Sequence, residues 1–470
     1  MRFHEMGVRE IAAGVREKKF SAAEVFEDCL KRAEECENEK KLSALITVTA
    51  EAGRVQAKRI DDMVAKGEPA GLLAGVPVVL KDNICTRGIR TTAGSRILGD
   101  WAPTYDATAW TLLSGQGAVL LGKGDMDELG YTSSVSDGSA SATAAGYVPF
   151  SLGTDTGGSI RLPAAYCGVY GLKPTYGLVS RNGLIAYASS LDQIGPFTRA
   201  VEDMALVMRS LARRDPKDST SIDKSGMDFT RRTGTLKGRR IALVKEFMNF
   251  SLDQPIADAM KRVIKLFEDS GAKVVEVSLP IVANYATACY HVIAMSEAHT
   301  NFARFDGVRY GHAAEAAGFL SMRETFEAVR SEGFGADIKS RIIAGTYLAQ
   351  PDGYEKYYLA ATRMRTLVAA EFDKAFESTG AGKIDCILQP VTPSLSGKNA
   401  AKEYELDLYT LPANVAGLPG LSFRAGCSDT GLPVGLQLVG PRWSDEALLD
   451  IGFELENNLC IPKCIAELGR

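Results

Sequence analysis

The chain has 470 residues, of which 46% are hydrophobic and 24% charged, as is ordinary for a globular protein. Its formal net charge of −4 gives no reason to expect direct binding along nucleic-acid phosphates. The nine cysteines include no CxxC pair, which favours reduced thiols in the cytoplasm over a disulfide framework or a zinc site. No apolar run approaches the ~20 residues of a membrane span, and the polar start argues against a signal peptide.

Residues 1–68 are predicted to be helical. Residues 21–24, Ser-Ala-Ala-Glu, form a capping box at a helix start. Apolar residues then recur at helical spacing from Ala22 to Ala33. We interpret this stripe as a packing surface and assign it no catalytic role.

Residues 76–80 form a continuous apolar run, which suits a strand buried on both faces, and Lys81 stands at its end. A lysine in such a place is usually a paired or snorkelling residue. Acting as a base demands more, because an ordinary lysine with a pKa of ~10.4 is almost entirely charged at pH 7. Burial or nearby positive charge has to lower that pKa by about three units, which is roughly 4 kcal/mol.

Residues 153–161, Gly-Thr-Asp-Thr-Gly-Gly-Ser-Ile-Arg, are rich in small residues and follow an apolar run. Glycine loses the most conformational entropy on ordering, so this composition suits a loop whose backbone approaches a ligand closely. The N–H groups of Thr156, Gly157 and Gly158 are predicted to form a cup for a developing oxyanion beside the Ser159 hydroxyl. The alternative is a Gly-Gly turn with a capping serine.

Three blocks of the sequence resemble the amidase signature family: residues 153–161, residues 172–177 (Leu-Lys-Pro-Thr-Tyr-Gly) and residues 75–83 (Gly-Val-Pro-Val-Val-Leu-Lys-Asp-Asn). The resemblance extends from near residue 20 to about residue 455. It implies a single α/β domain over residues 1–470, with a large mixed β-sheet flanked by helices and a helical N-terminal segment.

In this family Lys81 and Ser159 correspond to the base and the nucleophile of an unusual Ser–Ser–Lys triad. The bridging serine comes from a Gly-Gly-Ser-Ser-Gly-Gly-Ser run after a long segment that this chain lacks, and its position here is Val135. Ser136 matches the second serine of the run and is the candidate replacement, with Ser134 as an alternative if the junction is rearranged. A further alternative is that the natural protein carries a loop that this sequence lacks.

Strands and helices alternate through the rest of the chain, which favours a continued α/β sheet. Beside the run at 76–80, we expect strands at 117–122, 240–245, 273–277, 384–388 and 434–439, and helices at 107–114, 201–212, 256–270 and 444–456.

Residues 286–378 are predicted to be a mainly helical insertion that lines the substrate side. Short segments in it resemble the A-type component of the amidotransferases that act on Glu-tRNA(Gln) and Asp-tRNA(Asn). That group holds the free ends of glutamine through positions matching Tyr290, Arg341 and Asp407. A guanidinium can bind an α-carboxylate bidentately, and a carboxylate can hold an α-ammonium. Each residue alone has an alternative interpretation as a surface ion pair.

The resemblance implies that Ser159 attacks the side-chain amide of glutamine, forms a glutamyl ester and releases ammonia. A B-type kinase/transamidase subunit then uses this ammonia with ATP and Mg²⁺, a small C-type subunit completes the complex, and tRNA contacts the partner mainly. This chain is expected to be cytoplasmic, away from membranes, and to need no cofactor or metal. The alternatives are a stand-alone amidase on another amide, and a catalytically impaired scaffold subunit because Val135 replaces the bridging serine.

A serine–histidine–aspartate triad and a metal site have little support in the sequence. The chain has four histidines, none near Ser159. No His/Asp/Glu cluster has the spacing of metal ligands.

Overall fold

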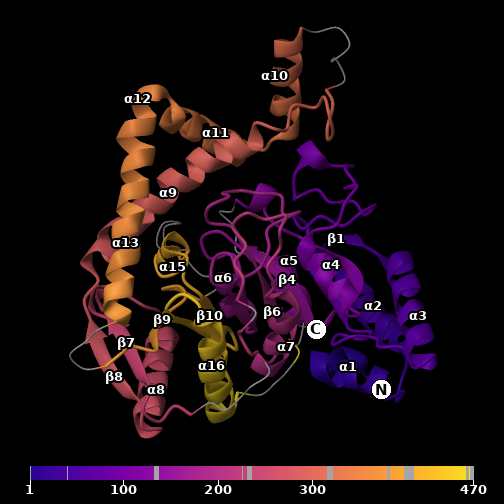
Figure 1. The fold of residues 1–470 in the computed structure, drawn as a ribbon, viewed down its shortest axis with the longest axis horizontal. Helices are drawn as coiled ribbons and strands as arrows, with labels where there is room; N and C mark the ends of the chain where they lie inside the picture. The colour runs from indigo at the N-terminus through magenta and orange to yellow at the C-terminus, as the bar shows by residue number, and fades with distance from the viewer. Residues whose placement is uncertain are drawn as a thin grey trace.

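The structure, a computed structural model, describes residues 2–39, 41–131, 137–224, 226–229, 235–314, 321–377, 382–395, 407–461 and 465. These residues form an α/β fold in which helices flank one mixed sheet of 11 strands (Figure 1). The strand order is β1-β3-β2-β4-β6-β5-β10-β11-β9-β7-β8. The strands are β1 (Leu45–Val48), β2 (Pro77–Lys81), β3 (Val119–Gly124), β4 (Phe150–Asp155), β5 (Tyr170–Lys173), β6 (Gln193–Thr198), β7 (Arg240–Val244), β8 (Lys273–Val277), β9 (Cys386–Pro390), β10 (Gly420–Cys427) and β11 (Pro433–Val439).

The described helices cover both faces of this sheet and extend beyond it. They are α1 (Val8–Arg16), α2 (Ala22–Asn38), α3 (Ala50–Ala65), α4 (Thr108–Gly115), α5 (Gly138–Ala144), α6 (Arg161–Cys167), α7 (Val201–Leu211), α8 (Gln254–Asp269), α9 (Pro280–Phe302), α10 (Met322–Gly333), α11 (Ala336–Ala349), α12 (Pro351–Gly353), the π-helical turn η6 (Tyr354–Leu359), α13 (Ala360–Phe376), α15 (Leu411–Ala416) and α16 (Asp445–Leu459).

Strand β2 lies between β3 and β4 and runs parallel to both. Val78 pairs with Phe150 and Leu80 with Leu152. All five residues of β2 are buried, which confirms the strand expected from the apolar run and fits a strand covered on both faces. Because the three strands are parallel, their carboxyl ends meet at one edge of the sheet, where the candidate active site lies.

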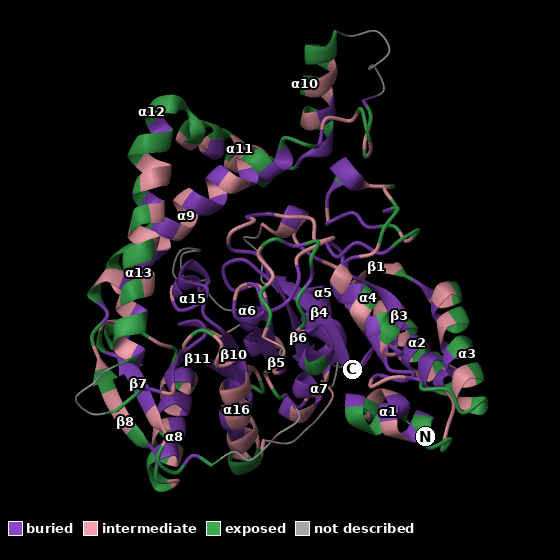
Figure 2. Ribbon diagram, in the orientation of Figure 1, coloured by how far each residue is buried: buried purple, intermediate pink, exposed green. Residues whose placement is uncertain are grey.

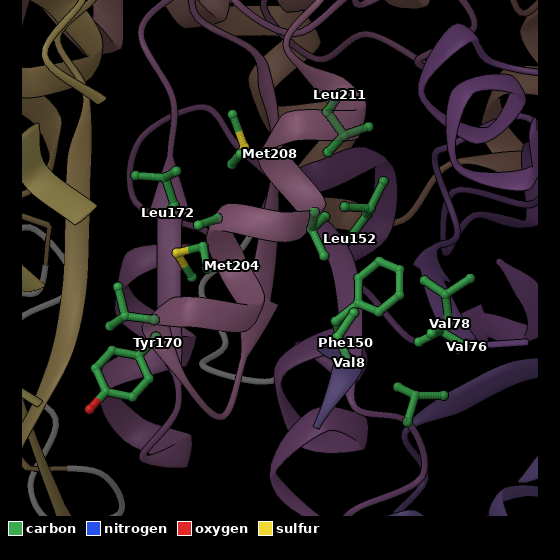
Figure 3. Close-up of a cluster of buried hydrophobic side chains, with 14 of the residues drawn as sticks. Val8, Val76, Val78, Phe150, Leu152, Tyr170, Leu172, Met204, Met208 and Leu211 are labelled. Atoms are coloured by element: carbon green, nitrogen blue, oxygen red, sulfur yellow. The ribbon is translucent and has the colours of Figure 1, made fainter. Parts of the chain in front are cut away.

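Apolar side chains from the central strands pack against α7 and the N-terminal helices (Figure 3). Figure 2 shows the resulting purple centre, in which the strands are buried and the outer helices are exposed on one side. Each fully buried aliphatic or aromatic side chain contributes about 1.5–3 kcal/mol relative to an exposed one. The side chains in this cluster include Val8, Val76, Val78, Phe150, Leu152, Tyr170, Leu172, Met204, Met208 and Leu211.

The N-terminal segment is mainly but not entirely helical, so the prediction for residues 1–68 is wrong in one place. The predicted capping box is present: Glu24 N donates to Ser21 Oγ at 3.1 Å, and Ser21 N donates to Glu24 Oε2 at 2.8 Å. Strand β1 interrupts the helices and pairs antiparallel with β3 at the edge of the sheet. Its sequence, Leu-Ile-Thr-Val, is rich in β-branched residues, which favour a pleated strand.

Where the structure describes it, the region 286–378 is mainly helical, as predicted, with a non-helical stretch at residues 303–314. Helices α9, α11 and α13 extend away from the sheet, and α10 lies at the far end (Figure 1). A second apolar cluster holds α9, α13 and α15 together. None of the described helices combines the length and the apolar character needed to cross a bilayer. The described cysteines form no disulfide with one another.

Candidate active site

Lys81 and residues 156–160 lie at the same edge of the sheet. Lys81 ends β2, and the loop at 156–160 follows β4, the parallel neighbour of β2. Asn83 Nδ2 donates to Thr154 Oγ1 at 3.0 Å, which joins the segment after β2 to the end of β4. The fold therefore brings two residues 78 positions apart in the sequence, the predicted base and the predicted nucleophile, to one edge.

The loop at 156–160 is anchored by a buried ion pair between Asp155 and Arg161. Arg161 Nε donates to Asp155 Oδ2 at 3.1 Å, and Ile160 N donates to the same oxygen at 3.2 Å. Asn414 Nδ2 donates to Asp155 Oδ1 at 2.8 Å. Burial opposes the charged carboxylate, yet Arg161 holds the pKa of Asp155 below its usual value. This pair fixes both ends of the loop.

Thr410 closes the loop from the opposite side. Its Oγ1 donates to the carbonyl oxygen of Gly157 at 2.6 Å. Gly158 has a φ of +153°, and a Cβ atom there would come within 2.5 Å of Thr410 Oγ1. Only glycine fits this backbone without displacing Thr410.

The backbone N–H groups of Thr156, Gly157 and Gly158 donate to no other group among the residues that the structure describes. The adjacent Ser159 is partly exposed, whereas the three residues before it are buried. Orphan N–H groups beside a partly exposed serine are what an oxyanion-binding loop requires.

Lys81 is buried in an ion pair with Asp137. Its Nζ donates to Asp137 Oδ2 at 2.6 Å, and the two side chains are 5% and 3% exposed. Asp137 also caps α5, because its Oδ1 accepts Ser139 N at 2.9 Å and Ala140 N at 3.2 Å. The proposed replacements for the bridging serine, Ser136 and Ser134, and the position Val135 lie outside the described residues.

Tyr290, on α9, meets the loop at Gly157. A Cβ atom on Gly157 would come within 2.7 Å of Tyr290 Oη, so the hydroxyl lies against the backbone two residues before Ser159. Burial raises the pKa of Tyr290 well above its ordinary value, and Tyr187 and Asp407 add to this effect. The hydroxyl therefore stays protonated at neutral pH and can donate a hydrogen bond.

Arg341 and Asp407 converge on the same tyrosine. The Arg341 guanidinium stacks over the Tyr131 ring with its centre 3.8 Å from the ring centroid, and it donates to the Tyr131 hydroxyl. Both Arg341 and Asp407 interact electrostatically with Tyr290. The carbonyl of Asp407 accepts from Thr410 N at 3.0 Å, which ties it to the residue that closes the loop. The structure thus gathers the three predicted substrate-binding residues near the glycines of residues 156–160.

Asp192 is a buried carboxylate behind the loop that sequence reasoning did not single out. Thr156 Oγ1 donates to Asp192 Oδ1 at 2.6 Å, and the N–H groups of Tyr187 and Ala188 donate to Oδ2 at 2.9 and 3.0 Å. Burial is the largest influence and raises the pKa of Asp192 to about 6. No sequence pattern marks it, because its contact with Thr156 joins residues 36 positions apart.

His291 follows Tyr290 on α9 and is a weak base. Burial, with the nearby charge of Arg341, lowers the pKa of His291 to about 4, so this ring is neutral at pH 7. In the described part of the chain, no group of three or more His, Cys, Asp and Glu residues is placed to hold a metal ion.

Comparison with known proteins gives a consistent result. The sequence profile of the Amidase family matches residues 24–137 and 134–449. The chain is 44% identical to the A-type component of glutamyl-tRNA(Gln) amidotransferase from Heliobacterium modesticaldum, over 96% of each chain. It is 42% identical to the protein of the same name from Alkaliphilus metalliredigens, over 98% of each chain.

The family match comes in two segments, which overlap at residues 134–137. The alignment with the Heliobacterium protein has 480 positions and covers 96% of a 470-residue chain, so some of its positions have no counterpart here.

Solved structures share this fold. The A-type component of glutamyl-tRNA(Gln) amidotransferase from Thermotoga maritima superposes with a TM-score of 0.74 at 31% identity, over 97% of this chain and 95% of that chain. The native peptide amidase of Stenotrophomonas maltophilia superposes with a TM-score of 0.82 at 27% identity, over 98% and 99%. The fold, the family profile and these relatives together show that the chain belongs to the amidase signature family.

Proposed function

We propose that this chain is the glutaminase subunit of a tRNA-dependent amidotransferase, supplying ammonia for the conversion of Glu-tRNA(Gln), or Asp-tRNA(Asn), to the amide form. The observation that carries the proposal is the contact of Tyr290 with the backbone of Gly157, with Arg341 and Asp407 interacting with the same tyrosine. A site for the two charged ends of an amino acid thereby adjoins a candidate nucleophile. The names of the curated relatives support the same function.

In the proposed reaction, Ser159 Oγ attacks the side-chain amide carbon of glutamine. The N–H groups at residues 156–158 bind the oxyanion that develops, and removing one such donor costs about 3–4 kcal/mol in comparable sites. The C–N bond then breaks, ammonia leaves and a glutamyl ester remains on Ser159. Water hydrolyses this ester, releasing glutamate and restoring the serine hydroxyl.

Three side chains are assigned to substrate binding. The Arg341 guanidinium binds the α-carboxylate of glutamine, and the Asp407 carboxylate binds its α-ammonium. Tyr290, which remains protonated, donates a hydrogen bond to the substrate beside the nucleophile. Together they select a free amino acid over an amide that lacks these charges.

Lys81 is assigned as the base that accepts the Ser159 proton, directly or through water, with Ser136 as the candidate bridge. ATP and Mg²⁺ belong to a B-type kinase/transamidase partner that also provides most tRNA contacts, and a small C-type subunit completes the complex. We assign no cofactor or metal to this chain and place it in the cytoplasm.

A stand-alone amidase is the second candidate, because the Stenotrophomonas peptide amidase shares the fold over nearly its whole length. That candidate predicts turnover without partner subunits and indifference to Arg341→Ala.

Trapping with hydroxylamine tests the proposal. The chain is assembled with its partner subunits and given glutamine and hydroxylamine, which intercepts a glutamyl ester as γ-glutamyl hydroxamate. We expect hydroxamate from the wild-type complex and none from the Ser159→Ala complex. Equal amounts from both complexes would remove Ser159 as the nucleophile.

A further inference from the structure

Asp137 is a buried carboxylate for which the proposed reaction has no use. The structure places this carboxylate on the proposed base, Lys81.

The contacts of Asp137 fix the orientation of its carboxylate. Its Oδ1 accepts the N–H groups of Ser139 and Ala140 at the start of α5, and its Oδ2 accepts Lys81 Nζ at 2.6 Å. An ionised carboxylate has only acceptors, and both Asp137 oxygens are engaged by these donors. The side chains of the pair are 5% and 3% exposed, which shields their attraction from solvent.

The charged groups on the elements around α5 have partners of their own. This helix packs on β2, β3, β4, β6 and α6. On β3, Lys123 lies 3.5 Å from Asp82, and Arg161 of α6 pairs with Asp155 of β4. The segment Gln193–Thr198 of β6 has no charged residue.

The charge of Asp137 acts on two further titratable groups, Asp125 and Cys167. Burial raises the pKa of Asp125 above its usual value, with Asp137 among the groups that add to the shift. Burial likewise raises the pKa of the Cys167 thiol to about 11. Among the described residues, Asp137 is the carboxylate within ion-pair distance of Lys81.

We propose that Asp137 clamps Lys81 in its protonated form and thereby restrains the nucleophile at neutral pH. Attack by Ser159 requires its proton to pass to the lone pair of a neutral lysine, while the Ser159 oxygen forms the new bond to carbon and the C–N bond breaks. An ammonium held by a carboxylate has no lone pair to accept that proton. Burial disfavours a charged amine, so removing the Asp137 charge shifts the equilibrium toward the form with a free lone pair.

This inference rests on the proposed function only in taking Ser159 as the nucleophile. The test therefore uses a fluorophosphonate probe, which labels an activated serine without any need for glutamine binding. The complex carrying the full chain is labelled between pH 6 and 10, and the rate at Ser159 is followed by peptide mass spectrometry. Asp137→Asn is the decisive variant, because asparagine keeps the size and the helix-capping ability of aspartate but not its charge.

We expect the midpoint of the pH–rate profile to fall by about one to three pH units in Asp137→Asn, since an opposite charge at this distance has effects of that size. Labelling at pH 7 then becomes at least about tenfold faster. Asp385→Asn is the matched control, because it breaks a remote ion pair in which Arg239 Nη1 lies 2.7 Å from Asp385 Oδ1. Its profile should match that of the wild type.

Identical profiles for Asp137→Asn and the wild type would overturn the clamp. If neither complex is labelled at any pH, the assignment of Ser159 as the nucleophile fails instead. NMR titration of the Lys81 Cε resonance in both complexes then tests the effect of Asp137 on Lys81 independently of Ser159. A lower midpoint in Asp137→Asn supports the clamp, and an unchanged midpoint overturns it. Asp137→Gly provides a second variant should Asp137→Asn unfold, with the same expected direction.

Discussion

The hydroxyl of Tyr290 lies so close to the backbone of Gly157 that a Cβ atom on the glycine would come within 2.7 Å of it. Tyr290 belongs to α9, whereas Gly157 lies between β4 and α6. The contact joins the helical region 286–378 to the edge of the sheet, and it places the proposed substrate residue Tyr290 beside the loop that carries the candidate nucleophile.

Gly157→Ala tests this contact. The added methyl group would also come within 2.8 Å of Leu411 Cδ2, so either the tyrosine or the loop must move. A displacement of about 1 Å in a catalytic site costs roughly 100-fold in rate, and we expect kcat/KM for glutamine to fall by about that factor. Gly115→Ala is the control, because no described atom lies within 4 Å of the place that its Cβ atom would take. Equal activity of both variants would contradict the contact.

Arg341→Ala is expected to raise the KM for glutamine. The variant loses a charged hydrogen bond to the α-carboxylate, which is worth about 1.5–3 kcal/mol, or roughly 10- to 150-fold. Steady-state ammonia release by the complex measures the effect. Arg323→Ala is the control, since Arg323 is 87% exposed and pairs only with Glu327 of its own helix among the described residues. An unchanged KM for Arg341→Ala would favour the stand-alone amidase.

Thr410→Val is expected to lower kcat. It removes the hydroxyl that donates to the Gly157 carbonyl at 2.6 Å and leaves that buried oxygen without this bond. The lost bond is worth about 1 kcal/mol in stability, and the displaced loop should lower kcat by roughly tenfold. Thr410→Ser keeps the hydroxyl and should retain most of the activity. If Thr410→Ser is as slow as Thr410→Val, the hydroxyl is not what positions the loop.

Asp192 should make stability depend on pH. Burial is the main reason that its pKa is raised from 3.8 to about 6, so the folded state binds this proton more tightly than the unfolded state. Its contribution to stability is therefore fully present below pH ~4 and is lost as the pH rises through about 6. The loss is on the order of 3 kcal/mol.

Unfolding measured between pH 3.5 and 7.5 for the wild type and Asp192→Asn checks this contribution. The difference in unfolding free energy between the two proteins should change by about that amount across the interval ~4–6. Asp258→Asn, at an exposed carboxylate, should show no such change. A pH-independent difference for Asp192→Asn would show that Asp192 has the same affinity for its proton in both states.

The strands that the sequence predicted best are those with continuous apolar runs. Strands β2 and β8 lie within one residue of their expected ends. Their apolar composition directly indicates burial in the sheet. Strands β5, β6 and β10 were not predicted. Strand β6 contains Gly195 and Pro196, which argue against a strand locally, and its pairing with β4 overrides that preference.

The residues of the candidate site also differ in how well the sequence predicts them. Ser159 and Lys81 stand out because their neighbours follow a family pattern, whereas Asp137 lies 56 positions from Lys81. Which carboxylate meets a buried lysine depends on how α5 packs against β2, and no local pattern contains that information. Thr410 and Asp192 were not predicted for the same reason, since each acts on the loop at residues 156–160 through tertiary contacts.

The most direct test of the central claim is ammonia release from glutamine by the complex that contains this chain, measured beside the Ser159→Ala complex. We predict release by the wild type that increases with pH, and no release by an equally well assembled Ser159→Ala complex. Ammonia release that persists in Ser159→Ala would contradict the account.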